Sequence, residues 1–271
     1  HDFVAGDYMW TGIDYLGEAN WPQRSAGCGC LDTCGFEKDA FYFYKSVWNQ
    51  NEKFAYLCPH WNLKLEKGTV LPVICYTNCE DAELFVNGRS FGMKSKGFPC
   101  YGMTERYGHF DRYRRPANTD DLFLSWDVPY EPGKIEVVGY HDGKEVCRYK
   151  VETTGEAASI KLTVDKTSVD ADGRSIVQAE VRIVDSEGRL VFNACPELDF
   201  TLEGDAKIIG IDNGDPACHE QWKETKGRHA FNGMAYAVIR AGQNKGELTL
   251  TVQASGVDAA IGKASVTISQ K

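Results

Sequence analysis

Short runs of alternating apolar and polar residues, separated by tight-turn residues, constrain the fold of this chain more than any other feature. The first set of runs lies at residues 70–76, 82–86, 122–126 and 135–140. Asn87-Gly88 and Asp142-Gly143 separate runs in the manner of two-residue hairpin loops. Alternation with a period of two turns one face of each strand toward a core. We therefore expect an immunoglobulin-like β-sandwich over residues 51–153.

The same alternation resumes after a linker-like stretch at residues 151–156. The second set of runs lies at residues 160–164, 177–184 and 248–252. Turn pairs occur at Asp172-Gly173 and Glu187-Gly188, which fits further short strands. We expect a second sandwich of immunoglobulin-like, invasin-type architecture over residues 156–271.

The first 50 residues have a different, aromatic-rich composition. They begin with a strand candidate at residues 3–10, continue through a Gly-rich loop, and end in a helix candidate at residues 40–49. Apolar residues recur in that helix at helical spacing, and Asp39 suits its positively polarised first turn. Strand, loop and helix together make one βα unit, which cannot bury its core alone. Because the chain opens directly in strand-like sequence, we expect residues 1–50 to come from within a larger protein.

Charge and hydropathy exclude several classes of function. The chain has 30 basic and 39 acidic residues, a net charge of -9, which argues against a nucleic-acid partner. No apolar run approaches the roughly 20 residues of a membrane-spanning helix.

Metal and cofactor motifs are also weak. Cys28, Cys30 and Cys34 form the one tight cysteine group, without the spacing or the nearby fourth ligand of a zinc site. Asp212-Asn213-Gly214-Asp215 lacks the ligand rhythm of a calcium loop and predicts a turn held by Asn and Asp side chains. We therefore predict no metal and no cofactor.

The candidate binding residues follow the first predicted strand. Trp10 offers a flat apolar face to a sugar ring, and Asp14 and Glu18 offer carboxylates to its hydroxyl groups. Trp21 adds a second indole close by. Taken alone, these residues fit core aromatics and a helix-capping aspartate better than a binding site.

Six ordered motifs resemble the β-galactosidases of glycoside hydrolase family 2. Residues 3–18 are similar to the last barrel strand of that family, and Trp21-Pro22 and Arg24-Ser25 to the residues that follow it. The other similar stretches lie at residues 31–39, 83–92, 126–155 and 210–216, followed by residues 219–220 and 230–233. The order of the motifs is kept along nearly the whole chain.

The resemblance implies a mainly β chain in which two immunoglobulin-like sandwiches follow the C-terminal βα fragment of a (β/α)8 barrel, residues 1–50. It further implies a retaining hydrolase of β-linked galactosides or related glycans, which needs two catalytic carboxylates. In the family both are glutamates on earlier strands, so we expect no catalytic residue in this chain and no activity from it alone. Trp10 matches the family's substrate-contacting tryptophan, and Asp14, Glu18 and Trp21 are further substrate-binding candidates.

Three more expectations follow, and one alternative stays open. The parent hydrolase is expected to be periplasmic or secreted. The barrel remnant is expected either to be disordered or to promote self-association through its exposed apolar surface. Departures from the family at residues 17–20 and 28–30 leave the sugar undetermined. The alternative is a stand-alone carbohydrate-binding or adhesion module of tandem immunoglobulin-like domains. It requires exposed aromatics on a sandwich, where we expect Trp126 in the core and Trp222 at the surface.

Overall fold

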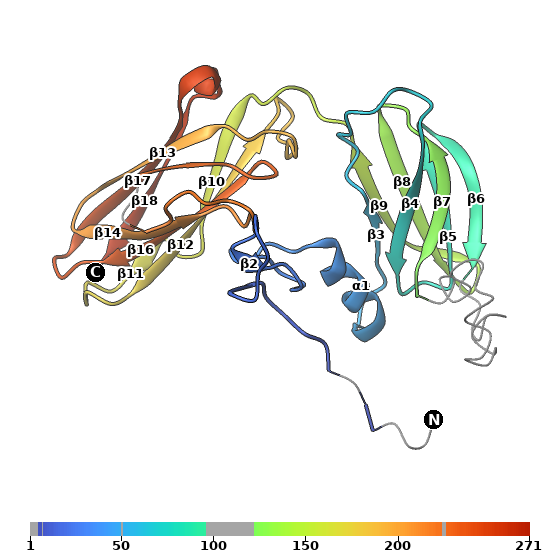
Figure 1. Ribbon diagram of the computed structural model, residues 1–271, viewed down its shortest axis with the longest axis horizontal. Coiled ribbons are helices and arrows are strands. Elements are labelled where there is room, and N and C mark those ends of the chain that lie inside the picture. Colours follow the sequence, from blue (N-terminus) through green and yellow to red (C-terminus); the bar gives the residue numbers. More distant parts are fainter. Residues whose placement is uncertain (1–4, 7, 50, 96–121, 224–225) are drawn as a thin grey trace. The chain divides into compact units, whose positions relative to one another are not determined.

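A computed structural model of the 271-residue chain describes residues 5–6, 8–49, 51–95, 122–223 and 226–271 (Figure 1). The chain divides into two compact units. The first, unit 1, combines His1–Phe36 with Thr154–Lys271, and the second, unit 2, is Glu37–Thr153. Both consist mainly of antiparallel β-sheet, as the alternating runs predicted.

In the described part of unit 2, helix α1 accompanies two sheets. The elements of this unit are α1 (Asp39–Trp48), β3 (Ala55–Cys58), β4 (Val70–Thr77), β5 (Asp81–Val86), β6 (Arg89–Ser95), β7 (Leu124–Pro129), β8 (Lys134–His141) and β9 (Lys144–Glu152). The sheets have the strand orders β3-β4-β7 and β6-β5-β8-β9. Residues of both sheets share one buried cluster, which includes Val73 and Trp126 from one sheet and Leu84 and Ile135 from the other. Two sheets around one core are consistent with the predicted sandwich.

The hairpins of unit 2 have the backbone that their sequences predicted. Asn87 and Gly88 both adopt left-handed conformations, with φ of +48° and +81°, between β5 and β6. Asp142 and Gly143 do the same between β8 and β9, with φ of +49° and +70°. Two successive left-handed residues turn the chain with the twist that a hairpin needs.

Helix α1 confirms the helical spacing seen in the sequence, and it belongs to unit 2. It contacts β3 and β4. The ring of Tyr42 stacks on that of Tyr56 with centroids 3.6 Å apart, and the Tyr56 hydroxyl donates to Asp39 Oδ1 at 2.7 Å. Val47 and Trp48, at its C-terminal end, stay exposed.

Unit 1 contains two larger sheets and a short ladder. Its strands are β1 (Tyr15–Leu16), β2 (Ser25–Ala26), β10 (Ser159–Val164), β11 (Ser168–Val169), β12 (Ile176–Val184), β13 (Glu197–Glu203), β14 (Ala206–Asp212), β15 (Gly227–His229), β16 (Met234–Ala241), β17 (Gly246–Ala254) and β18 (Lys263–Gln270). The sheets have the orders β10-β12-β16-β14 and β11-β18-β17-β13-β15, with only the β11–β18 pair parallel among the described strands. Val181 and Ile239 from one sheet and Phe200 and Leu250 from the other share a buried cluster.

The strand expected at residues 3–10 is not seen. Phe3, Val4 and Asp7 lie outside the described residues, and the remaining residues of this stretch form no strand. A strand needs neighbouring strands to satisfy its backbone groups, and none pairs with these remaining residues in the described part of the chain. The barrel fragment therefore stays a prediction.

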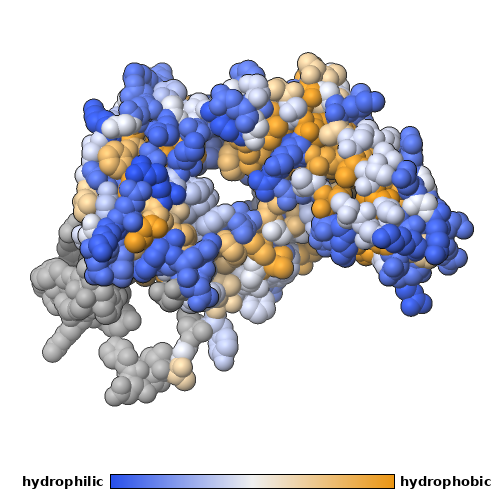
Figure 2. Space-filling model, turned by 180° about the vertical axis from the view of Figure 1, so that it is seen from behind, coloured by the Kyte–Doolittle hydropathy of each residue, from blue (hydrophilic) through white to orange (hydrophobic). Residues whose placement is uncertain are grey.

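No helix in the described part of the chain is both long and apolar enough to cross a membrane. Hydrophilic residues cover much of the face in Figure 2, where apolar residues reach the surface in separate patches. Trp126 is buried and Trp222 is 44% exposed, as predicted.

Candidate functional site

The segment that carries the predicted binding residues, residues 8–36, is a loop structure built on a minimal β-ladder. β1 pairs with β2, so that Tyr15 lies opposite Ala26. An isolated bridge joins Ile13 to Leu31, and the Asp14 amide donates to the Leu31 carbonyl at 2.9 Å. These backbone bonds fix the loop although it buries little apolar surface of its own.

Trp10, Tyr15 and Glu18 form a hydrogen-bonded row at the surface of this loop. The indole N–H of Trp10 donates to the Tyr15 hydroxyl at 2.9 Å, and that hydroxyl donates to Glu18 Oε2. The bond to the Glu18 carboxylate raises the pKa of Tyr15. The Trp10 ring meets Tyr15 edge to face at 6.1 Å and remains 71% exposed. The row thus holds a solvent-facing indole in one orientation.

Asp14 lies inside the loop. Its side chain is buried, and Oδ1 accepts a hydrogen bond from the Gly29 amide at 2.7 Å. A Cβ at position 29 would lie 2.3 Å from the Asp14 amide nitrogen, so only glycine permits this approach. The arrangement makes Asp14 a brace between two halves of the loop.

Trp21 contacts the sandwich of unit 1. Its ring stacks on that of His219 with centroids 4.9 Å apart and an angle of 28°. His219 Nε2 lies 2.6 Å from the Pro22 carbonyl oxygen, which can only accept, so this nitrogen carries the proton. Trp21 is nevertheless 84% exposed, which leaves its other face open.

A buried ion-pair network anchors the loop. One guanidinium nitrogen of Arg24 lies 2.8 and 2.9 Å from the two carboxylate oxygens of Asp212, at the end of β14. Arg228, whose side chain is fully buried, contacts the same Asp212 oxygen at 2.8 Å. The Arg24 amide also donates to the Pro216 carbonyl at 2.8 Å. Two arginines therefore share one carboxylate between the loop and the sandwich.

The turn after β14 matches its prediction from sequence. Asn213 Oδ1 accepts from the Asp215 amide at 3.1 Å, and Asp215 Oδ1 accepts from the Ala217 amide at 2.8 Å. Gly214, with φ of +77°, passes so close to Asp32 that a Cβ there would lie 2.0 Å from Oδ2. The acidic residues at this turn are engaged in its hydrogen bonds and in ion pairs.

The three cysteines of the loop differ in their exposure to solvent. Cys28 is exposed, Cys30 is buried with its sulfur 3.5 Å from that of Met9, and Cys34 is half-buried. Burial raises the pKa of the Cys34 thiol, which disfavours the thiolate that a metal would need. Nearby, Asp32 accepts from the amides of Cys34 and Phe36, and burial raises its pKa.

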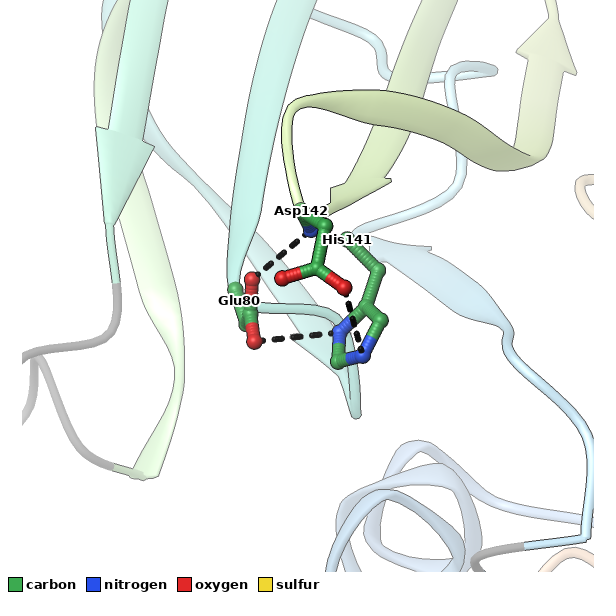
Figure 3. A group of neighbouring side chains, drawn as sticks. All are labelled: Glu80, His141 and Asp142. Carbon is green, nitrogen blue, oxygen red and sulfur yellow. Dashed lines mark hydrogen bonds and ion pairs between the residues drawn. The ribbon is translucent and has the colours of Figure 1, made fainter.

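Glu80, His141 and Asp142 in unit 2 place their ligand atoms within 4.8 Å of one another (Figure 3). Glu80 approaches Nδ1 of His141 at 3.2 Å, whereas Asp142 faces Nε2 at 4.0 Å. The Glu80 carboxylate also accepts a hydrogen bond from the Asp142 amide at 3.0 Å. A single ion would need both carboxylates beside one ring nitrogen, so the geometry is that of an ion-pair cluster on a hairpin turn.

Sequence reasoning assigned no role to three residues that organise the loop. Tyr15 connects Trp10 with Glu18, and its place three residues before Glu18 was the available signal. His219 and Arg228 come from a part of the chain about 200 residues away. Nothing in a single sequence pairs them with the loop.

Known proteins resemble this chain along its length. Residues 160–262 match the family described as Glycoside hydrolase family 2 C-terminal domain 5, and residues 68–147 match a domain of unknown function, DUF4982. The chain is 36% identical to Beta-galactosidase BoGH2A of Bacteroides ovatus, over 98% of the chain and 29% of that protein. It is 32% identical to a putative beta-glucuronidase of Formosa agariphila, over 88% of the chain and 22% of that protein.

A solved structure is similar as well. A glycosyl hydrolase family 2 member from Bacteroides cellulosilyticus matches with a TM-score of 0.86 and 28% identity, over 100% of the chain and 36% of that structure. The chain thus spans about a third or less of the length of these relatives.

Proposed function

This chain carries C-terminal domains of glycoside hydrolase family 2, and from that premise we propose that it is the C-terminal part of a β-glycosidase that cleaves β-linked galactosides or related glycans. The observation that carries the proposal is the 36% identity to a β-galactosidase along 98% of the chain. Because the chain corresponds to 29% of that relative, most of such an enzyme lies in other segments.

The two essential carboxylates belong, in this proposal, to those other segments. A retaining glycosidase needs a nucleophile and an acid/base about 5 to 5.5 Å apart. Asp14 is buried and holds the Gly29 amide, and Glu18 accepts from Tyr15, so both have structural bonds already. Neither is assigned to catalysis, and the chain alone is assigned no turnover.

Trp10 is the substrate-contacting residue of the proposal. The indole is exposed and its orientation is held by Tyr15, so it presents a ready-made stacking face to a sugar ring. Glu18 and Trp21 are assigned to the same rim, and Asp14 to shaping it. Residues 1–50 then supply the last βα unit of a (β/α)8 barrel, with the barrel's remaining strands in the rest of the protein.

The sugar is the finer part of the proposal. Galactosides are favoured by the β-galactosidase relative, whereas a relative at 32% identity carries the name of a β-glucuronidase. A glucuronide adds a carboxylate to the sugar, which calls for a cationic partner that the exposed row of Trp10, Tyr15 and Glu18 does not contain. We assign galactosides first for that reason. We also assign a periplasmic or secreted location, by analogy with glycan-degrading enzymes.

The test uses the complete protein that contains this chain, assayed with nitrophenyl β-galactoside and β-glucuronide. Trp10→Ala is expected to lower kcat/KM about tenfold, which corresponds to about 1.4 kcal/mol of transition-state stabilisation. Trp222→Ala is the matched control, a partly exposed tryptophan on the sandwich, and should leave kcat/KM unchanged. Turnover by the 271-residue chain alone, or equal effects of the two variants, would contradict the assignment.

Self-association is a separate consequence. Tyr8, Trp10, Ile13, Leu16 and Trp21 all expose at least half of their surface in unit 1. Exposed apolar residues at this density favour association when their covering segment is missing. The chain alone is expected to form dimers or larger species in sedimentation velocity, and a strict monomer at high concentration would count against the idea.

A further inference from the structure

Two cysteine sulfurs meet in the interior of unit 2, outside the loop of Trp10. Cys79, two residues before β5, has its Sγ 3.5 Å from Sγ of Cys147 in β9. The two residues are 68 positions apart in the chain. This is close to van der Waals contact, and closing it to a disulfide bond of about 2.05 Å needs a movement of about 1.5 Å.

Gly139, in the middle strand β8, makes room for the pair. It lies opposite Cys147 in the ladder with β9, and opposite Ala82 in the ladder with β5. A Cβ at position 139 would lie 2.6 Å from both sulfurs. A glycine within a strand commonly marks such a close approach. Both sulfurs thus converge on the space above one glycine.

The surroundings favour reaction between these two thiols. The hydrogen bond from Cys147 lowers the pKa of the Cys79 thiol to about 6, helped by the positive charge of Lys53. His141 also lowers the pKa of Cys79, whereas burial raises it. Cys79 is buried and Cys147 is half-buried, so an oxidant from solvent reaches Cys147 first.

We propose that Cys79 and Cys147 are a modification site, at which a small-molecule disulfide cross-links unit 2 through a Cys79–Cys147 bond. Cys147 passes its proton to the hydrogen-bonded Cys79 thiolate as its sulfur attacks oxidised glutathione, which forms a mixed disulfide and releases one glutathione thiolate. The released glutathione thiolate takes that proton from Cys79. The Cys79 thiolate then attacks the Cys147 sulfur and releases the second. The two cysteine thiols lose two electrons and two protons in total, and oxidised glutathione gains both as two glutathione thiols.

Cys75 provides the competing outcome. It is fully buried in β4, and its proximity contributes to raising the pKa of Cys147. Exposed cysteines such as Cys28 and Cys195 would instead form only mixed disulfides with glutathione. The experiment must therefore identify which sulfurs are joined.

The experiment equilibrates the full chain with buffers of oxidised and reduced glutathione, blocks remaining thiols after unfolding, and maps the peptides by mass spectrometry. The expected product is a peptide pair joined at Cys79 and Cys147, two hydrogen masses below the sum of the reduced peptides. The oxidised chain is also expected to melt at a higher temperature than the reduced chain, because the link closes a long loop. Cys75→Ala should retain the link, and Cys147→Ala should lose it.

Gly139→Ala is the geometric control, because its methyl group would occupy the space of both sulfurs. It is expected to abolish the link while the exposed cysteines react as before. Wild-type protein decides the proposal even where a variant fails to fold. Full alkylation of Cys79 and Cys147 after oxidation, or a Cys75–Cys147 peptide in place of the expected one, would overturn it.

Discussion

Asp212 is the residue whose removal should most weaken unit 1, because two arginines depend on its carboxylate. Arg228 has a fully buried side chain, and Arg24 keeps 15% of its side chain exposed. Removing one partner of a buried ion pair costs about 3–5 kcal/mol, since a charge is left uncompensated. Asp212 itself is 26% exposed, which admits some water. We therefore expect Asp212→Ala to lower the free energy of unfolding of unit 1 by about 3 kcal/mol.

The measurement is urea and thermal unfolding of the full chain, followed by calorimetry and tryptophan fluorescence. A loss of about 3 kcal/mol should lower the Tm of a unit of this size by about 6–12 °C. Asp170→Ala, an exposed aspartate of the same unit, is the matched control and should change stability by no more than about 0.5 kcal/mol.

A double-mutant cycle separates the ion pair from other effects. Arg24→Met removes the less buried arginine and is expected to cost about 1–2 kcal/mol. The double variant with Asp212→Ala should be less destabilised than the sum of the two, because both changes remove the same contact. Limited proteolysis should then cut within residues 8–36 faster in each variant. A cost of Asp212→Ala below 1 kcal/mol, or strict additivity, would refute the reasoning.

Two further predictions concern unit 1. Gly214→Ala should destabilise it by about 2 kcal/mol or more in urea unfolding, because φ is +77° and the new methyl group would collide with Asp32; a neutral result would mean that Asp32 can move aside. Burial by itself raises the pKa of Asp185, but hydrogen bonds from the Arg189 side chain and from three backbone amides outweigh it and hold that pKa well below its usual range. The stabilisation that these bonds give the ionised Asp185 carboxylate is present above the unfolded pKa of about 3.9 and is lost as pH falls toward the folded pKa. Asp185→Asn should therefore flatten the decline in Tm between pH 5 and about pH 2. An unchanged decline would contradict the assignment.

Local signals account for the parts of the fold that could be predicted. Helix α1 follows from apolar spacing over ten residues, and the hairpins at Asn87-Gly88 and Asp142-Gly143 follow from residues that tolerate left-handed backbone. The alternating runs all contain strands, because a period of two turns one face of a strand toward the core. Each of these features depends on neighbours within a few positions, which one sequence displays.

Contacts between distant residues account for what could not be predicted. Arg228 stands in a polar stretch and looks like a surface residue, yet its side chain is fully buried, pairs with Asp212 and donates to the Glu220 carbonyl. Arg24 finds its partner 188 positions away. The expected strand at residues 3–10 fails for a related reason, because the described part of the chain contains no strand that pairs with its described residues. Pairings of this kind depend on the folded topology and leave no periodic trace.

The anchoring of residues 8–36 gives the second sandwich a role beyond spacing. Arg24 pairs with Asp212, and Trp21 stacks on His219. The loop that orients the exposed Trp10 therefore takes its position from the end of β14 and the turn after it. If Trp10 stacks on sugar, as we propose, then a change at Asp212 alters substrate binding without touching substrate. Such a variant of the complete enzyme should raise KM more than it lowers kcat, because the catalytic carboxylates stay in place while the stacking face moves. A stand-alone binding module would have no turnover through which that coupling could appear.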